Sequence, residues 1–172
     1  MFLKAFKQKS KQKYINKLLN SRRLEFKQGK IKNVGIILNL KEFDQFEAFL
    51  TFFKSLEIQD NKISVLAFVE NDKQVNPLWG NYFSSKDFGW KGKLKNIELK
   101  NFLDNEFDIL ISFYKQNVLE LNLVTAKSKA NFKVGLSGLD NRLYDLILDV
   151  DTNDFKLFKS ELTKYLTVLN KI

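Results

Sequence analysis

The alternation of short apolar runs with longer amphipathic segments is the feature that most constrains the fold of this chain. The short runs are rich in Ile, Leu, Val and Phe, which is typical of strands buried on both faces of a sheet. They cover residues 34–38, 63–69, 107–113, 132–136 and 143–150. The longer segments repeat apolar residues at three- and four-residue steps, as amphipathic helices do. They cover residues 43–56, 98–103, 118–125 and 155–169.

Strands and helices that alternate at this spacing predict an α/β fold with a mostly parallel sheet. Right-handed crossovers place helices on both faces, which gives a doubly wound, Rossmann-like or flavodoxin-like three-layer sandwich. The length of 172 residues suits one domain. We therefore predict a basic helical extension over residues 1–32 and a single α/β domain over residues 33–172.

Two helix starts carry capping patterns. Asn117 is followed three residues later by Glu120, which resembles a capping box. The last helix follows Asp151, Thr152 and Asn153, each of which can cap it. These patterns predict where the two helices begin.

The positive charge is concentrated in the N-terminal fifth of the chain. The net charge is +9, yet residues 1–32 alone carry eleven Lys and Arg against one carboxylate, and the rest of the chain has a net charge of −1. Such asymmetry indicates an anionic partner, whether RNA, DNA, a lipid surface or an acidic protein. The alternative is a solvated helix whose lysines keep the protein soluble. The candidate anion-binding residues here are Lys4, Lys7, Lys9, Lys11, Lys13, Lys17, Arg22 and Arg23.

The apolar residues of the same segment form two groups. One group has helical spacing and is predicted to dock on the domain. It consists of Tyr14, Ile15, Leu18 and Leu19. The other group lies on a different side of the helix, where it is a candidate anchor for a partner or a membrane surface unless the terminus frays. It consists of Phe2, Leu3 and Phe6.

A second basic segment covers residues 82–95, within the longest stretch that lacks periodicity. Lysines alternate there with Tyr82, Phe83, Phe88 and Trp90. Aromatic rings stack on bases while ammonium groups contact phosphates, a composition suited to single-stranded nucleic acid. The alternative is a loop whose rings cover the edge of the sheet. The candidate residues are Lys86, Trp90, Lys91 and Lys93.

Absent residue types and motifs exclude several kinds of chemistry. The chain has no Cys and no His, which rules out disulfides, cysteine nucleophiles, imidazole bases and most zinc sites. It also has no glycine-rich phosphate loop. No apolar stretch approaches a membrane span, and lysines interrupt the apolar residues at the start, so we expect a cytoplasmic protein.

One carboxylate pair offers an alternative site. Asp149 and Asp151 come directly after residues 146–148 of an expected strand, where two carboxylates can hold Mg²⁺ or Mn²⁺ as in sugar-nucleotide transferases. The same residues also suit a helix cap.

Three segments carry a resemblance to a known family. The start MFLKAFK, the segment KYINKLL at residues 13–19 and the block FSSKDFGWKGK at residues 83–93 resemble an uncharacterised family of small Bacteroidota proteins with a domain of unknown function. The likeness covers nearly the whole chain. It implies no activity, substrate, cofactor or catalytic residue.

These observations favour a non-catalytic cytoplasmic binding or adaptor protein without a cofactor, whose basic N-terminus engages RNA or a ribonucleoprotein. The alternative is a small nucleotide- or sugar-nucleotide-binding enzyme that uses a divalent metal at Asp149 and Asp151. A third possibility is peripheral attachment to an anionic membrane.

Overall fold

The computed structural model describes residues 2–22, 28–71, 81–89 and 93–172, with only the backbone of residues 2–4 and 7. The helices are α1 (Phe2–Ser21), α2 (Phe46–Ser55), α3 (Ile97–Asp104), α4 (Leu119–Lys127) and α5 (Phe155–Val168). The strands are β1 (Val34–Asn39), β2 (Ile63–Phe68), β3 (Tyr82–Phe83), β4 (Ile109–Phe113), β5 (Lys133–Leu136) and β6 (Leu146–Leu148). Short 3₁₀ helices cover Asp60–Lys62, Ser85–Asp87 and Asn141–Leu143.

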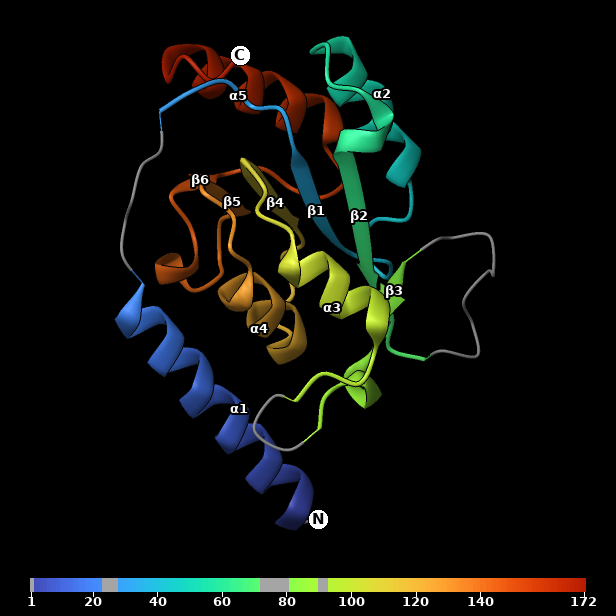
Figure 1. Cartoon of the computed structure of the whole chain (residues 1–172), viewed down its shortest axis with the longest axis vertical. Coiled ribbons are helices and arrows are strands. Elements are labelled where there is room, and N and C mark those ends of the chain that lie inside the picture. Colours follow the sequence, from blue (N-terminus) through green and yellow to red (C-terminus); the bar gives the residue numbers. More distant parts are fainter. Residues whose placement is uncertain (1, 23–27, 72–80, 90–92) are drawn as a thin grey trace.

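The six strands form one sheet in the order β3-β2-β1-β4-β5-β6, and every neighbouring pair is parallel (Figure 1). This confirms the predicted Rossmann-like α/β fold. The chain first builds outward from β1 to β3 and then returns to the other side of β1 with β4. The carboxyl ends of β1 and β4 therefore form the topological switch point, where ligands bind in open sheets of this kind.

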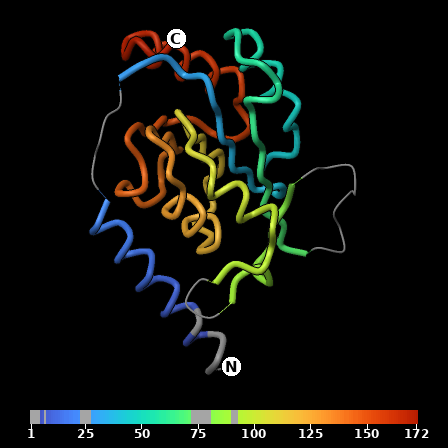
Figure 2. Tube along the Cα trace, in the orientation of Figure 1, coloured from blue at the N-terminus to red at the C-terminus, as the bar shows by residue number. Residues whose placement is uncertain are grey.

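Helices cover both faces of the sheet. On one face α2 and α5 pack through Phe49 and Phe158, which are completely buried. On the other face α1, α3 and α4 pack around a second cluster that includes Phe107 and Leu121. Figure 2 shows α1 and α5 at opposite sides of the molecule. On its face of the sheet, α1 is the outermost helix and packs beside α4.

Two strand glycines allow close packing of aromatic rings against the sheet. A Cβ atom at Gly35 would lie 2.6 Å from the ring of Phe107, and one at Gly135 would lie 2.5 Å from the ring of Tyr144. Both separations are far shorter than van der Waals contact, so larger residues would displace the rings.

The capping predictions at the two helices are wrong. α4 follows Val118 without a side-chain cap, because the oxygen of Asn117 accepts from the amide of Asn122 at 2.6 Å and Glu120 binds a lysine of α1. α5 is capped by Asp154, whose carboxylate accepts from the backbone of Leu157 at 3.0 Å. Three of the expected capping side chains, Asn117, Glu120 and Asp151, thus have other partners in the folded chain.

Candidate functional site

The helix α1 is fixed to the domain by an apolar stripe. The side chains of Ile15 and Leu19 are 2% and 9% exposed, and Tyr14 and Leu18 are half-buried against the same cluster. This confirms the docking face predicted from the helical spacing. The ammonium group of Lys127 on α4 donates to the hydroxyl of Tyr14 at 3.4 Å and lies 5.2 Å from its ring centre.

Two ion pairs reinforce this docking and use cations that the sequence offered as anion-binding residues. Lys11 Nζ lies 2.7 Å from Glu120 Oε1, with side chains only 11% and 14% exposed. Arg22 Nη2 lies 2.6 Å from Asp145 Oδ2, and Nη1 donates to the carbonyl of Arg142 at 3.0 Å. Lys11 and Arg22 are therefore committed to the body of the protein and do not face a partner.

Among the described side chains of α1, three other lysines face solvent, and we call them the lysine stripe: Lys9, Lys13 and Lys17. Their four-residue spacing places them above one another on one side of the helix. α1 contains no acidic residue. Within the part of the chain that the structure describes, no ion pair involves these side chains. Lys13 and Lys17 also line a surface depression of about 770 Å³ along α1.

The segment after β3 lies beside the N-terminal half of α1. Lys11 Nζ sits 5.2 Å from the ring centre of Phe88, which joins the two basic segments in one region. Phe83 and Phe88 are buried in the core, as expected for rings that cover the sheet edge, so they cannot stack on a base in this structure. Lys86 and Lys93 are exposed.

Some predicted site residues lie outside the described part of the chain. Nothing is described for Arg23, Trp90 and Lys91, or for the side chains of Lys4 and Lys7.

A buried hydroxyl network lies between the sheet and α4, and no sequence pattern indicated it. The hydroxyl of Thr125 is 3.0 Å from those of Ser112 and Tyr114, and Tyr144 donates to Tyr114 at 3.2 Å. Burial raises the pKa of both tyrosines. All four groups are buried beneath α4, so the network packs the interior and offers no surface for a ligand.

Lys133 enters the same region from β5. Its ammonium group donates to the carbonyl of Thr125 at 2.7 Å, and its side chain is almost inaccessible to solvent. Burial lowers the pKa of Lys133 to about 7, with a further reduction from Arg22 and an opposing effect of Asp145. Loss of the proton relieves the cost of a buried charge.

The switch point of the sheet is filled by a carboxylate of the chain itself. Glu42 accepts from the side-chain amide of Asn39 at 2.8 Å and from the backbone amides of Lys115 at 2.7 Å and Gln116 at 3.2 Å. Glu42 thus joins the loops after β1 and β4. In this conformation it occupies the place where a ligand anion binds in related folds.

The carboxylates proposed for a metal have hydrogen-bond partners within the chain. Asp149 accepts from the hydroxyl of Ser137 at 2.6 Å, and Asp151 accepts from the backbone of Asn153 at 3.0 Å. Among the described residues, no three side chains of His, Cys, Asp or Glu gather into a group that could hold a metal ion.

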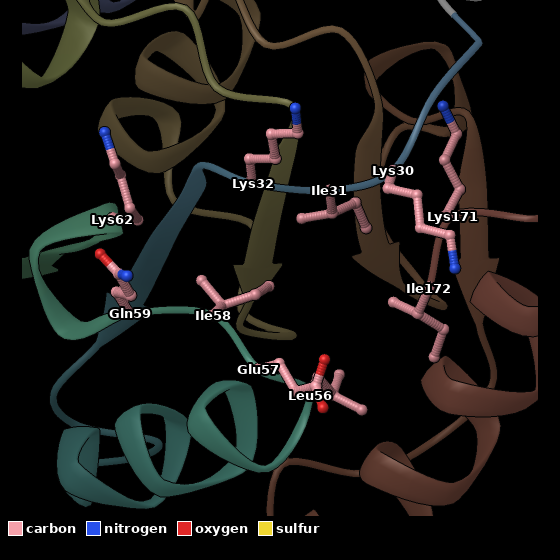
Figure 3. A pocket seen from close by; sticks show the side chains of 10 residues that line it. All are labelled: Lys30, Ile31, Lys32, Leu56, Glu57, Ile58, Gln59, Lys62, Lys171 and Ile172. Atoms are coloured by element: carbon pink, nitrogen blue, oxygen red, sulfur yellow. The ribbon is translucent and has the colours of Figure 1, made fainter.

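A pocket of about 400 Å³ opens at the amino ends of the strands, near the start of β1 and β2 (Figure 3). Its floor includes Ile31 and Ile58, which are buried. In Figure 3 the side chains of Lys32 and Lys62 extend away from Leu56 on the opposite wall. The ammonium groups of these two lysines therefore point out of the pocket.

Phe6 of α1 exposes 56% of its surface, and the side chains of Phe2 and Leu3 lie outside the described part of the chain. In the described part of the chain, no helix is both long enough and apolar enough to span a membrane.

Comparison with known proteins identifies the family. The model of a family of unknown function, DUF6913, matches residues 7–169. The chain belongs to this family. The match includes the lysine stripe, the basic segment of residues 82–95 and the whole sheet. The family description states no activity. No curated protein and no solved structure matches the chain.

Proposed function

We propose that this protein is a non-catalytic binding protein that holds a nucleic acid, with RNA as the favoured ligand, on the exposed side of α1. The observation that carries the proposal is the lysine stripe. Lys9, Lys13 and Lys17 face solvent from a helix without acidic residues, and the opposite side of that helix is fixed to the domain.

Support for a polymeric anion comes from the spacing of the charges. Four residues of α-helix rise about 6 Å, so the three ammonium groups are distributed over about 12 Å. A small anion cannot contact all of them, whereas a chain of phosphates can. Lys86 and Lys93 are exposed in the segment whose Phe88 contacts Lys11 of α1.

The proposed binding mode depends on phosphate contacts. Because Phe83 and Phe88 belong to the core, the described part of the 82–95 segment contributes lysines and no stacking platform. Affinity should then come mainly from counterion release and fall steeply with salt.

Fluorescence anisotropy with a labelled single-stranded RNA tests the proposal over a range of KCl concentrations. The variant replaces Lys9, Lys13 and Lys17 by Gln. Each lost phosphate contact reduces the salt slope by about 0.7, so we expect a reduction of about 2. A matched control replaces Lys32, Lys62 and Lys156, which are exposed elsewhere, and should bind as the wild type does.

Two results would contradict the proposal. One is the absence of RNA binding at low salt, and the other is an equal loss of binding in both triple variants. Binding to anionic vesicles in place of RNA, abolished by Phe6→Ser, would identify a membrane surface as the partner instead.

A further inference from the structure

The exposed side of α1 carries a second stripe, made of side-chain amides. Amide side chains recur every four residues in the sequence QKSKQKYINKLLN, and a lysine follows each of the first three. We call these four residues the amide stripe: Gln8, Gln12, Asn16 and Asn20. Gln8, Gln12 and Asn20 are exposed, and Asn16 is half-buried.

The two stripes run side by side along the helix. Residues three apart in a helix have Cβ atoms about 5–6 Å from each other. Lys9 therefore neighbours Gln12, Lys13 neighbours Asn16, and Lys17 neighbours Asn20. The oxygen of Asn16 accepts from Arg142 at 3.1 Å, which holds this amide in place.

The order of the stripes around the helix is asymmetric. On its other side, the amide stripe neighbours the side chains that dock on the domain. Gln8, Gln12 and Asn16 each lie three residues before one of these side chains, namely Lys11, Ile15 and Leu19. The amides consequently lie between the lysines on one side and the body of the protein on the other. Among the described side chains of α1, exposed lysines flank the amides on one side only, because Lys11 on the other side is paired with Glu120.

This asymmetry distinguishes between nucleic-acid forms. A helix that enters a duplex groove meets phosphates on both walls, whereas a single strand has phosphates along one edge and bases along the other. Unpaired bases also expose hydrogen-bonding edges that Asn and Gln can read. The surface depression of about 770 Å³ includes members of both stripes, namely Lys13, Lys17, Asn16 and Asn20.

We infer that a single strand of nucleic acid lies along α1, with its phosphates on the lysine stripe and its base edges on the amide stripe. The inference rests on the proposed function and adds sequence preference to it. Gln12 and Asn20 are the specificity-determining residues, and the lysines contribute affinity that is independent of sequence.

Enrichment from random single-stranded RNA and DNA libraries, followed by sequencing, tests the inference. The wild type should enrich a short motif. The variant Gln12→Ala/Asn20→Ala should reduce that preference about tenfold or more while its salt slope stays unchanged. Lys17→Gln should show the reverse, with an intact motif and a salt slope lower by about 0.7. The control Gln59→Ala/Asn61→Ala changes exposed amides elsewhere and should keep both properties.

The outcomes separate this inference from the proposed function. Salt-dependent binding without any enriched motif, or tighter binding of duplex than of single strands, would refute the inference and leave the proposed function standing. A lack of binding to every nucleic acid would refute both. A motif found in RNA and DNA alike indicates recognition by bases and phosphates, and a motif found in RNA alone adds the 2′-hydroxyl. Either motif supports a single strand on α1.

Discussion

The ion pair between Lys11 and Glu120 should control the docking of α1. Lys11→Met removes the charge and keeps most of the apolar stem, and Glu120→Gln removes the opposite charge at nearly constant volume. Each single change leaves the other charge in a place where its side chain is only 11% or 14% exposed. An uncompensated charge there cannot recover the hydration that it has in the unfolded chain.

The expected magnitude follows from this burial. Removal of one partner from a fully buried pair costs about 3–5 kcal/mol, and the small remaining exposure lowers our expectation to about 2–3 kcal/mol of unfolding free energy for each variant. Lys11→Met loses a further ~0.5–1 kcal/mol because the ammonium group also lies over the ring of Phe88. The double variant leaves no unpaired charge, so we expect a coupling energy of about 2 kcal/mol between the two sites.

Urea denaturation of the four proteins in the double-mutant cycle measures this coupling. Hydrogen exchange of the backbone amides from Ile15 to Leu19 reports the docking of α1 directly, since these residues form its buried face. The coupling should persist in high salt, because a pair removed from solvent is screened little. Lys13→Met, at an exposed position of the same helix, is the control and should change stability by less than about 0.5 kcal/mol.

Additive effects of the two single changes would refute this reasoning. So would a Lys11→Met variant as stable as the Lys13→Met control. Either result would mean that α1 is held by its apolar stripe alone and that Lys11 is available to a partner.

Two further predictions concern groups away from α1. Glu42→Ala should destabilise the protein by about 2–4 kcal/mol in urea denaturation, because Asn39 and two backbone amides lose their acceptor. Added acetate should restore part of this lost stability. The control Glu47→Ala, at an exposed position, should show neither the loss nor the rescue. The pKa of Lys133, about 7, lies below its ordinary value of 10.5, so between these values the unfolded chain binds a proton that the folded chain lacks. Wild-type stability should therefore rise with pH across that window by up to ~1.4 kcal/mol per pH unit, relative to Lys133→Met, and equal slopes of the two proteins would contradict the assignment.

Local pattern was sufficient to predict most of the fold. The apolar runs that became β1, β2, β4, β5 and β6 were evident because a strand buried on both faces needs an uninterrupted apolar sequence. The docking face of α1 was evident for a similar reason, since helical spacing alone places Ile15 and Leu19 on one side. The two-residue strand β3 was missed, because so short an edge strand has no periodicity of its own.

Side-chain partners were far less predictable. The capping patterns at Asn117 and before α5 failed because a cap competes with every other donor and acceptor that folding brings near it. The carboxylate of Glu42 gave no sequence signal, although it joins two loops whose residues are more than seventy positions apart. Such contacts depend on the order of strands in the sheet.

The sequence by itself determined that this chain forms an α/β sandwich and that its positive charge precedes the domain, since periodicity and composition are local properties. Only the tertiary structure decided which cations remain exposed. Lys11 and Arg22 find their carboxylates 109 and 123 residues further along the chain, whereas Lys9, Lys13 and Lys17 face solvent. The physical reason is that an ion pair is favourable where folding places opposite charges together in a site that excludes water, and no short-range pattern encodes that position.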